Sequence, residues 1–249
     1  SLHDSIINNQ IINNGVMQTF YFNDYELNHM NYNEALLYDK RTYFQYYLSL
    51  IKTGNQLYFT FILKTDYNPI LLKATIFVLS FSLLFLFNTL LFGEVSIINK
   101  KNYSISYQMP QIIYSVILSA ILTGITKYFV LPEENIAELR YVKVKEMLNA
   151  QIIKFKNKTS CKHILYFLVD FILLLFIWFY VSLFCAVYRN TQNFLIEIVF
   201  ISLAFYLLYP FVLAIAPICL RIPSLKSEKR NKQCFFKLSK IIAALIYLI

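Results

Sequence analysis

Two long apolar runs separated by a short polar segment dominate the hydrophobic pattern of this chain. They cover residues 164–188 and 194–220, and the polar connection is residues 189–193. A helix needs about 20 apolar residues to cross the hydrocarbon core of a bilayer, and each run is longer than that. The pattern predicts a transmembrane hairpin, because so short a connection leaves no room for a domain between the two helices.

Two further apolar runs precede this hairpin, at about residues 70–92 and 111–131. They predict the first and second of four transmembrane helices. The charged segment 132–160 places apolar residues three or four apart, which predicts a separate helix outside the membrane. Pro210 and Pro217 lie in the fourth span, where each removes a backbone donor and is expected to kink the helix.

The two ends of the chain have different patterns. Residues 1–33 are rich in Asn with little periodicity, which predicts a loosely ordered head or linker. Residues 34–69 carry aromatic and aliphatic positions at helical spacing, which predicts an amphipathic helix on the membrane surface, followed at residues 57–63 by a strand or a shallow interfacial segment. Residues 221–249 form a basic tail that leads into an apolar segment, either an interfacial helix or the start of a fifth span. The predicted fold is an all-α membrane protein with four transmembrane helices and cytoplasmic amphipathic helices.

Composition and charge agree with this fold. The chain is 58% hydrophobic and 15% charged, with a formal net charge of +9. Lys and Arg gather before the first span, between the second and third, and after the fourth. The positive-inside rule therefore places these segments and both termini in the cytoplasm, and the charge is read as contact with anionic lipid rather than with nucleic acid.

Polar residues within the spans are candidates for helix packing and for function. Asn88 and Thr89 are expected to hydrogen-bond neighbouring helices, and the small-residue face Ser115, Ser119, Ala120 and Gly124 is expected to pack closely against another helix. Asp170 is an acid about two turns inside the third span, and an acid at a helix centre costs about 2.5–3.5 kcal/mol on insertion scales. Lys127 and Lys73 lie at a similar depth in the second and first spans. We predict an intramembrane charge pair of Asp170 with Lys127 or Lys73, structural in preference to an ion or proton path.

The sequence contains no recognisable catalytic motif. The three histidines do not cluster, no CxxC occurs, and neither a glycine-rich phosphate loop nor a Ser/His/Asp set is present. We therefore expect neither enzyme activity nor a cofactor or metal. Asn102 begins an N-glycosylation sequon in the loop placed outside the membrane, which makes it a candidate glycosylation site.

Two apolar faces outside the spans are candidate contacts with other membrane subunits. They are the stripe Tyr141, Val144, Leu148 and Phe155, and the face Tyr43, Tyr47 and Leu50. Packing of either face against the protein's own cytoplasmic parts is the simpler alternative.

Five segments carry a further pattern: DKRTYFQYYLSLIK (39–52), DYNPILLK (66–73), YQMPQIIYSVILS (107–119), FCAVYRNTQNFLI (184–196) and YPF…P…LRI (209–222). Together they resemble a multi-pass region near the C-terminus of very large ciliate and related protist membrane proteins. Many of those proteins carry cysteine-rich extracellular repeats, and some are described as polycystin-like. The resemblance implies a membrane-embedded module of a larger surface or endomembrane protein, and it implies no active site.

Three functions fit these observations. The first is a non-catalytic module that anchors or assembles a larger membrane complex, as a scaffold at the cell surface or in an endomembrane. The second is a channel or transporter subunit, polycystin-like, with a path lined by Asp170 and Lys127. The third is an accessory subunit of a respiratory complex in the mitochondrial inner membrane.

Overall fold

The computed structural model describes residues 9–13, 16–20, 22–63, 66, 68–92, 105–131, 145–226 and 233–248. Within these ranges the regular structure is helical apart from one hairpin, in which β1 (Asn9–Asn13) pairs antiparallel with β2 (Val16–Phe20). The chain divides into two compact units. Unit 1 comprises residues 1–66 and 210–247, and unit 2 comprises residues 67–209 and 248–249.

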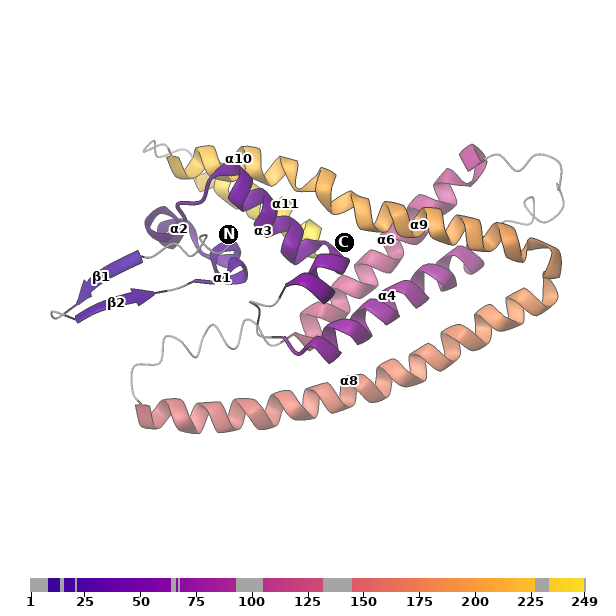
Figure 1. The fold of residues 1–249 in the computed structure, drawn as a ribbon, viewed down its shortest axis with the longest axis horizontal. Helices are drawn as coiled ribbons and strands as arrows, with labels where there is room; N and C mark the ends of the chain where they lie inside the picture. The colour runs from indigo at the N-terminus through magenta and orange to yellow at the C-terminus, as the bar shows by residue number, and fades with distance from the viewer. Residues whose placement is uncertain are drawn as a thin grey trace. The chain divides into compact units, whose positions relative to one another are not determined.

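Four helices among the described residues are long and apolar enough to cross a membrane. They confirm an all-α, multi-pass membrane protein, with candidate spans at Ile70–Leu90, Gln108–Val130, Ile152–Val187 and Arg189–Lys226. In unit 2, α4 (Ile70–Leu90) contacts both α6 (Ile105–Val130) and α8 (Lys145–Val187) (Figure 1). The turn η2 (Arg189–Thr191) then leads into α9 (Gln192–Leu213).

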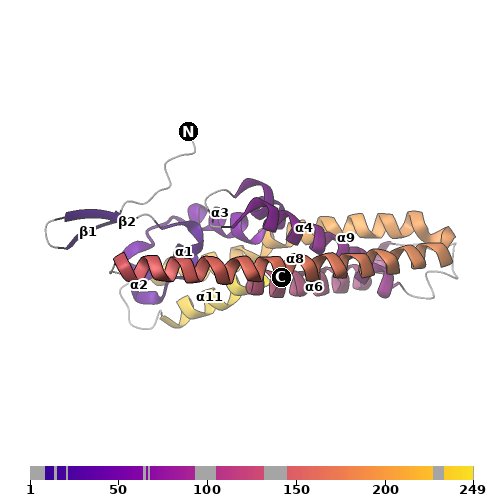
Figure 2. The ribbon, with the colours of Figure 1, turned by 90° about the horizontal axis from the view of Figure 1, so that it is seen from below.

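Helix α8 differs from the prediction of two separate helices in this region. It runs through 43 residues without a break, as Figure 2 shows. Neither Gly nor Pro occurs between Lys145 and Val187, so nothing in the sequence interrupts the helical hydrogen bonds. At 1.5 Å per residue the helix is about 65 Å long, roughly twice the thickness of a bilayer core. The predicted start of the outer helix at Pro132 lies outside the described residues.

The predicted kinks in the fourth span become a break between two helices. Helix α9 ends at Leu213 and α10 (Ile215–Lys226) begins two residues later. The backbone N–H of Ala214 still donates to the carbonyl of Pro210, at 3.0 Å. Pro217 falls in the first turn of α10, where a helix needs no N–H donor, so it starts this helix without bending it.

Three short helices follow the hairpin in unit 1, and the first of them lies within residues 1–33, where the sequence predicted a loosely ordered head. They are α1 (Asp24–His29), α2 (Tyr32–Tyr38) and α3 (Tyr43–Gly54). Each starts with a capping box, formed by Asn23 with Glu26, Asn31 with Glu34, and Thr42 with Gln45. These reciprocal bonds satisfy backbone donors at the first turn, which explains why an Asn-rich segment folds into helices.

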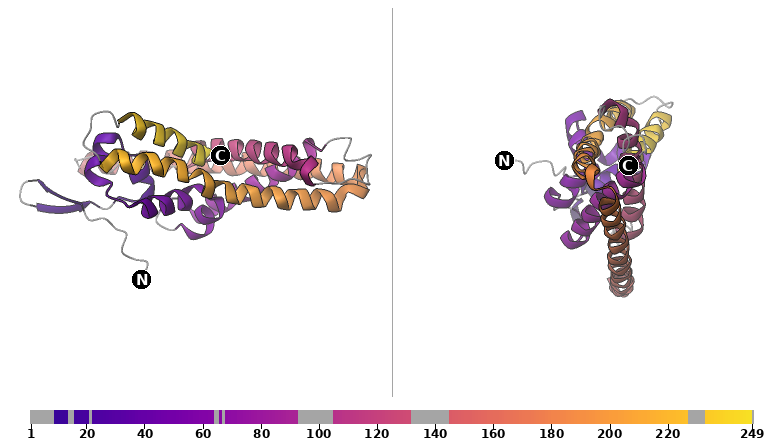
Figure 3. Two further views of the ribbon diagram at one scale, coloured as in Figure 1. Left: turned by 90° about the horizontal axis from the view of Figure 1, so that it is seen from above. Right: turned by 90° about the vertical axis from the view of Figure 1, so that its right-hand side faces the viewer.

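The apolar face predicted for a membrane-surface helix forms the core of unit 1 instead. Tyr46, Leu50 and Ile51 of α3 pack against α10 and α11 (Gln233–Leu248), through Ala214, Ile218, Ile222, Ala243 and Ile246. Figure 3 shows α10 and α11 side by side. Helix α11 is not among the four candidate spans. Between α3 and the first span, the residues predicted as a strand or interfacial segment form the π-helical turn η1 (Tyr58–Ile62).

Candidate functional site

A buried carboxylate held by two arginines lies at the centre of unit 1. Asp39 accepts from Arg41, with Nε to Oδ1 at 2.7 Å and Nη2 to Oδ2 at 2.8 Å. Arg221 of α10 donates to the Oδ2 atom as well, from Nε at 3.0 Å and from Nη2 at 2.8 Å. The carboxylate thus receives four charge-assisted hydrogen bonds, which are the strong kind. We call Asp39, Arg41 and Arg221 the arginine clamp.

Neighbouring groups satisfy the remaining donors of the clamp. Arg41 Nη1 donates to Asn28 Oδ1 and to Ser49 Oγ, both at 2.9 Å. Arg221 Nη2 donates to the carbonyl oxygen of Leu27 at 2.7 Å. Each guanidinium also lies 5.0 Å from the centre of the Tyr46 ring, and Arg221 lies 4.7 Å from the ring of Phe236. The clamp therefore ties α1, α3, α10 and α11 together through hydrogen bonds and cation–π contacts.

The charges of the clamp are balanced. Asp24 Oδ1 lies 3.8 Å from Arg41 Nη1, so two carboxylates accompany the two guanidinium groups. Burial alone would raise the pKa of Asp39, but the hydrogen bond and charge of Arg41, and then those of Arg221, lower it below its usual value. The pKa of Arg41 is raised, because the hydrogen bond and charge of Asp39 outweigh the effect of burial. At neutral pH Asp39 and Arg41 are therefore both ionised, which suits a structural ion pair.

Sequence reasoning missed the clamp. Its partners are far apart in the chain, and Asp39 and Arg41 lie in the segment 34–69 that predicts a helix on the membrane surface. A signal was present, because Arg221 is the single charge in the sequence between Glu197 and Lys226. A charge within so apolar a stretch needs a partner. The clamp also joins two of the five segments that carry the family resemblance, 39–52 and 209–222.

Unit 2 contains a buried polar node in which three helices meet. Asn88 Oδ1 of α4 accepts from Ser115 Oγ of α6 and from Ser202 Oγ of α9, both at 3.2 Å. The Asn88 carbonyl oxygen accepts from Gln111 Nε2 at 2.9 Å. This confirms that Asn88 hydrogen-bonds between spans, through Ser115 of the small-residue face and through Ser202, which the sequence did not single out. Thr89 instead donates to the carbonyl of Leu86 in its own helix. Such bonds fix the register of neighbouring helices, because lipid alone does not favour one register over another.

The three residues of the predicted charge pair lie toward one end of the α4, α6 and α8 bundle. Leu72, Ile76, Val130 and Tyr166 form one apolar cluster there, and Lys73, Lys127 and Asp170 each lie within a turn of it in sequence. Lys73 and Asp170 are buried, and Lys127 is half-buried. The Asp170 Oδ1 atom has no hydrogen-bond partner. Pairing of Asp170 with Lys127 or Lys73 stays a prediction.

Other predicted residues are placed only in part. Leu50 is fully buried inside unit 1, so the predicted partner face is reduced to the exposed Tyr43 and the half-buried Tyr47. Phe155 is half-buried on α8, where Leu148 also belongs to the helix. Asn102, Tyr141 and Val144 lie outside the described residues. The described His, Cys, Asp and Glu residues contain no group of three that could hold a metal.

The fold defines the class of protein as an integral, multi-pass membrane protein with four candidate spans. No family model, no curated protein and no solved structure matches the chain. The resemblance to the protist membrane region therefore stays a prediction.

Proposed function

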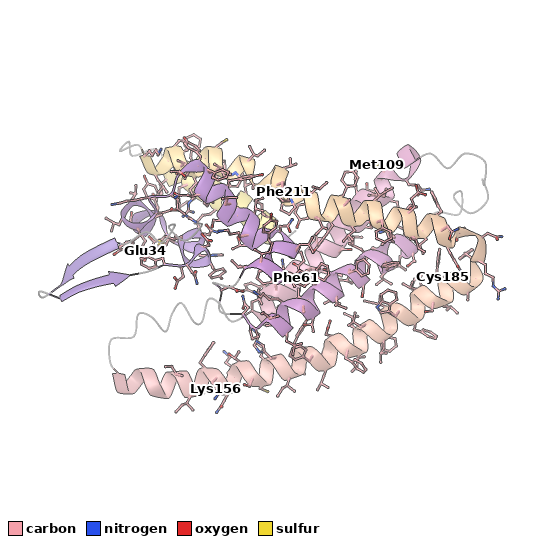
Figure 4. The ribbon with its side chains drawn as sticks, viewed as in Figure 1. Glu34, Phe61, Met109, Lys156, Cys185 and Phe211 are labelled. Carbon is pink, nitrogen blue, oxygen red and sulfur yellow. The ribbon has the colours of Figure 1, made fainter. Side chains whose placement is uncertain are left out.

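We propose that this protein is a non-catalytic integral membrane module that anchors or assembles a larger membrane complex. One observation carries the proposal: unit 1 presents large apolar side chains on segments outside the four candidate spans. Leu37 of α2 and Phe44 of α3 are each about two-thirds exposed, and η1 adds Ile62 and Phe61. Phe61 is labelled in Figure 4. Contiguous exposed apolar residues on a folded surface mark contacts with another protein or with a membrane.

The arrangement of α3 supports a protein partner for this surface. Its inner face is already used, because Tyr46, Leu50 and Ile51 are packed in the core of unit 1. Phe44 is exposed and lies on the side of the helix opposite Tyr46 and Leu50. The arginine clamp holds α3 against α10, so the outer face is presented by a fixed scaffold. A fixed apolar surface binds with little loss of conformational entropy. We infer that other membrane subunits dock here, with Tyr43 and Tyr47 at the edge of the contact.

Site-specific photocrosslinking tests the assembly role in native membranes. A photoreactive phenylalanine analogue replaces Phe44 or Leu37 in the full chain. We expect discrete crosslinked protein bands at both positions. Two other positions serve as controls for the same substitution. Tyr46 is buried within unit 1, and Phe179 is an exposed residue of the α8 span. Crosslinks to lipid alone at Phe44 and Leu37, as expected for Phe179, would contradict the proposal.

A second candidate function is a channel or transporter subunit. It is supported by the polar side chains buried within unit 2, namely the Asn88 node and Asp170. The test is ion flux into proteoliposomes that contain the purified chain. Flux that is lost in Asp170→Asn and kept in Ser182→Ala, an exposed position on the same helix, would favour this function over assembly. Absence of flux in the unmodified protein would contradict it.

A further inference from the structure

Three buried polar atoms without hydrogen-bond partners lie along one face of α8. They are Nε2 of His163, Oη of Tyr166 and Oδ1 of Asp170. Their spacing of three and four residues places them above one another on a single helix face. Tyr166 packs against Leu72 of α4 and Val130 of α6, so this face points into the bundle. The Tyr166 hydroxyl approaches Thr75 of α4, and the His163 ring approaches the backbone of Val130 of α6, each without a well-formed hydrogen bond.

Many hydroxyl groups elsewhere in the spans of unit 2 are satisfied locally. Ser80, Ser82 and Thr123 each donate to a backbone carbonyl three or four residues earlier in their own helix. The imidazole nitrogen and the phenol on α8 extend too far from the backbone for that, and an ionised carboxylate has no hydrogen to donate to a carbonyl. An unpartnered buried polar atom costs free energy, and water commonly removes the cost by bridging such atoms. Three such atoms in a row on one helix face are spaced so that water molecules could bridge them.

The row runs from the membrane surface into the bilayer. His163 directly precedes the apolar run that begins at Ile164, and Asp170 lies two turns deeper, about 10 Å along the helix axis. The charged groups on the surrounding elements are Lys73 of α4, Lys127 of α6 and Lys162 on α8 itself. Imidazole and phenol groups can each donate and accept a hydrogen bond, and a carboxylate can take up a proton.

We propose that this face of α8 is a water-linked proton path that ends at Asp170, where a proton is bound and released. Uptake forms the O–H bond of the carboxylic acid and breaks an O–H bond of the adjacent water molecule. That water molecule is reprotonated along the row past Tyr166 and His163 from water at the membrane surface, and no electrons are transferred. Rows of ionisable and polar groups inside spans serve as proton relays in membrane proteins. This role goes beyond assembly and does not depend on it.

Infrared spectroscopy of the reconstituted full chain tests the path. The carbonyl band of a protonated Asp170 is isolated by subtracting the spectrum of Asp170→Asn, over a titration from neutral to acidic pH. We expect this band to appear as the pH falls and to shift promptly when D₂O replaces H₂O. In His163→Leu/Tyr166→Phe the band should remain, and its exchange with D₂O should slow at least tenfold.

Tyr180→Phe is the matched control, because it removes a phenol from the same helix without touching the row. Its exchange rate should equal that of the unmodified protein. If Asp170→Asn does not fold, isotope-labelled aspartate identifies the band in the unmodified protein and in the double variant. The proposal is overturned if no Asp170 band appears, if the band never exchanges, or if the double variant exchanges as fast as the unmodified protein.

Discussion

The two units of this protein bury polar groups in different ways. Unit 1 buries full charges and pairs them closely, with four hydrogen bonds from Arg41 and Arg221 to one carboxylate. Unit 2 joins its helices through neutral amides and hydroxyls at Asn88, Ser115 and Ser202, and leaves one atom of Asp170 unpartnered. A buried charge such as Asp39 contributes to stability where all of its partners are supplied. An acid with an unpartnered atom, such as Asp170, fits the role in proton binding proposed above.

The largest expected effect comes from breaking the clamp. Arg221→Met removes two of the four hydrogen bonds to Asp39. The Asp39 carboxylate then keeps only the two bonds from Arg41. Loss of one partner from a buried ion pair typically costs about 3–5 kcal/mol. Hydrogen–deuterium exchange should rise in residues 24–54, while the fluorescence of Trp178, the single tryptophan, should stay unchanged because it reports on unit 2.

Lys237→Met provides the control for this experiment, since Lys237 is exposed on α11 and carries the same charge. It should leave exchange in unit 1 unchanged. Equal exchange in Arg221→Met and Lys237→Met would show that the clamp does not hold unit 1 together.

Acid should weaken unit 1 through the same clamp. The pKa of Asp39 is lower in the folded unit than its usual value, so its contribution to stability is complete above about pH 3.9 and is lost as the pH falls through the folded-state pKa. The difference in thermal stability between the unmodified protein and Arg221→Met should therefore hold from pH 7 down to about pH 3.9 and shrink below that pH. A constant difference between them at every pH would contradict the role given to Asp39.

A smaller effect is expected where α3 meets α11. A Cβ atom on Gly54 would lie 2.5 Å from Cγ2 of Ile246, so Gly54→Ala forces one of the two helices to shift. Overpacking of this kind costs about 1–3 kcal/mol. Ile246→Ala removes the clashing atom, so the double variant should recover part of the loss caused by Gly54→Ala. A double-mutant cycle of thermal unfolding measures this coupling, and purely additive effects would contradict the contact.

The smallest effect is expected at the polar node of unit 2. Ser202→Ala removes one bond to Asn88, and hydrogen bonds between membrane helices average about 0.6 kcal/mol. Trp178 donates to Ser82 across the α8–α4 contact, so its fluorescence follows the unfolding of this unit. Ser182→Ala serves as the control, because its hydroxyl bonds only the carbonyl of Trp178 within its own helix. If Ser202→Ala lowered the free energy of unfolding as much as Arg221→Met does, the two units would not differ in how much their buried polar groups stabilise them.

The sequence predicted the spans well, because span formation depends on the length of a local apolar run. It also predicted that Asn88 bonds between helices, since its amide is too large and too polar to be left unpaired within a span, whereas the smaller hydroxyl of Thr89 is satisfied within its own helix. It could not pair Arg221 with Asp39, whose positions differ by 182 residues, because no local pattern encodes that contact. The two helices that begin with Asn–Glu capping boxes were not predicted, for a different reason. The capping boxes are visible in the sequence, but this part of the chain has little hydrophobic periodicity.

The unbroken course of α8 has a mechanical consequence. A rod without Gly or Pro transmits a force along its length rather than absorbing it at a hinge. Lys156, on the segment ahead of the apolar run (Figure 4), is about 21 Å from Asp170 along the helix axis. A force applied at Lys156 therefore also moves Asp170, because the helix between the two residues rotates as one rigid body.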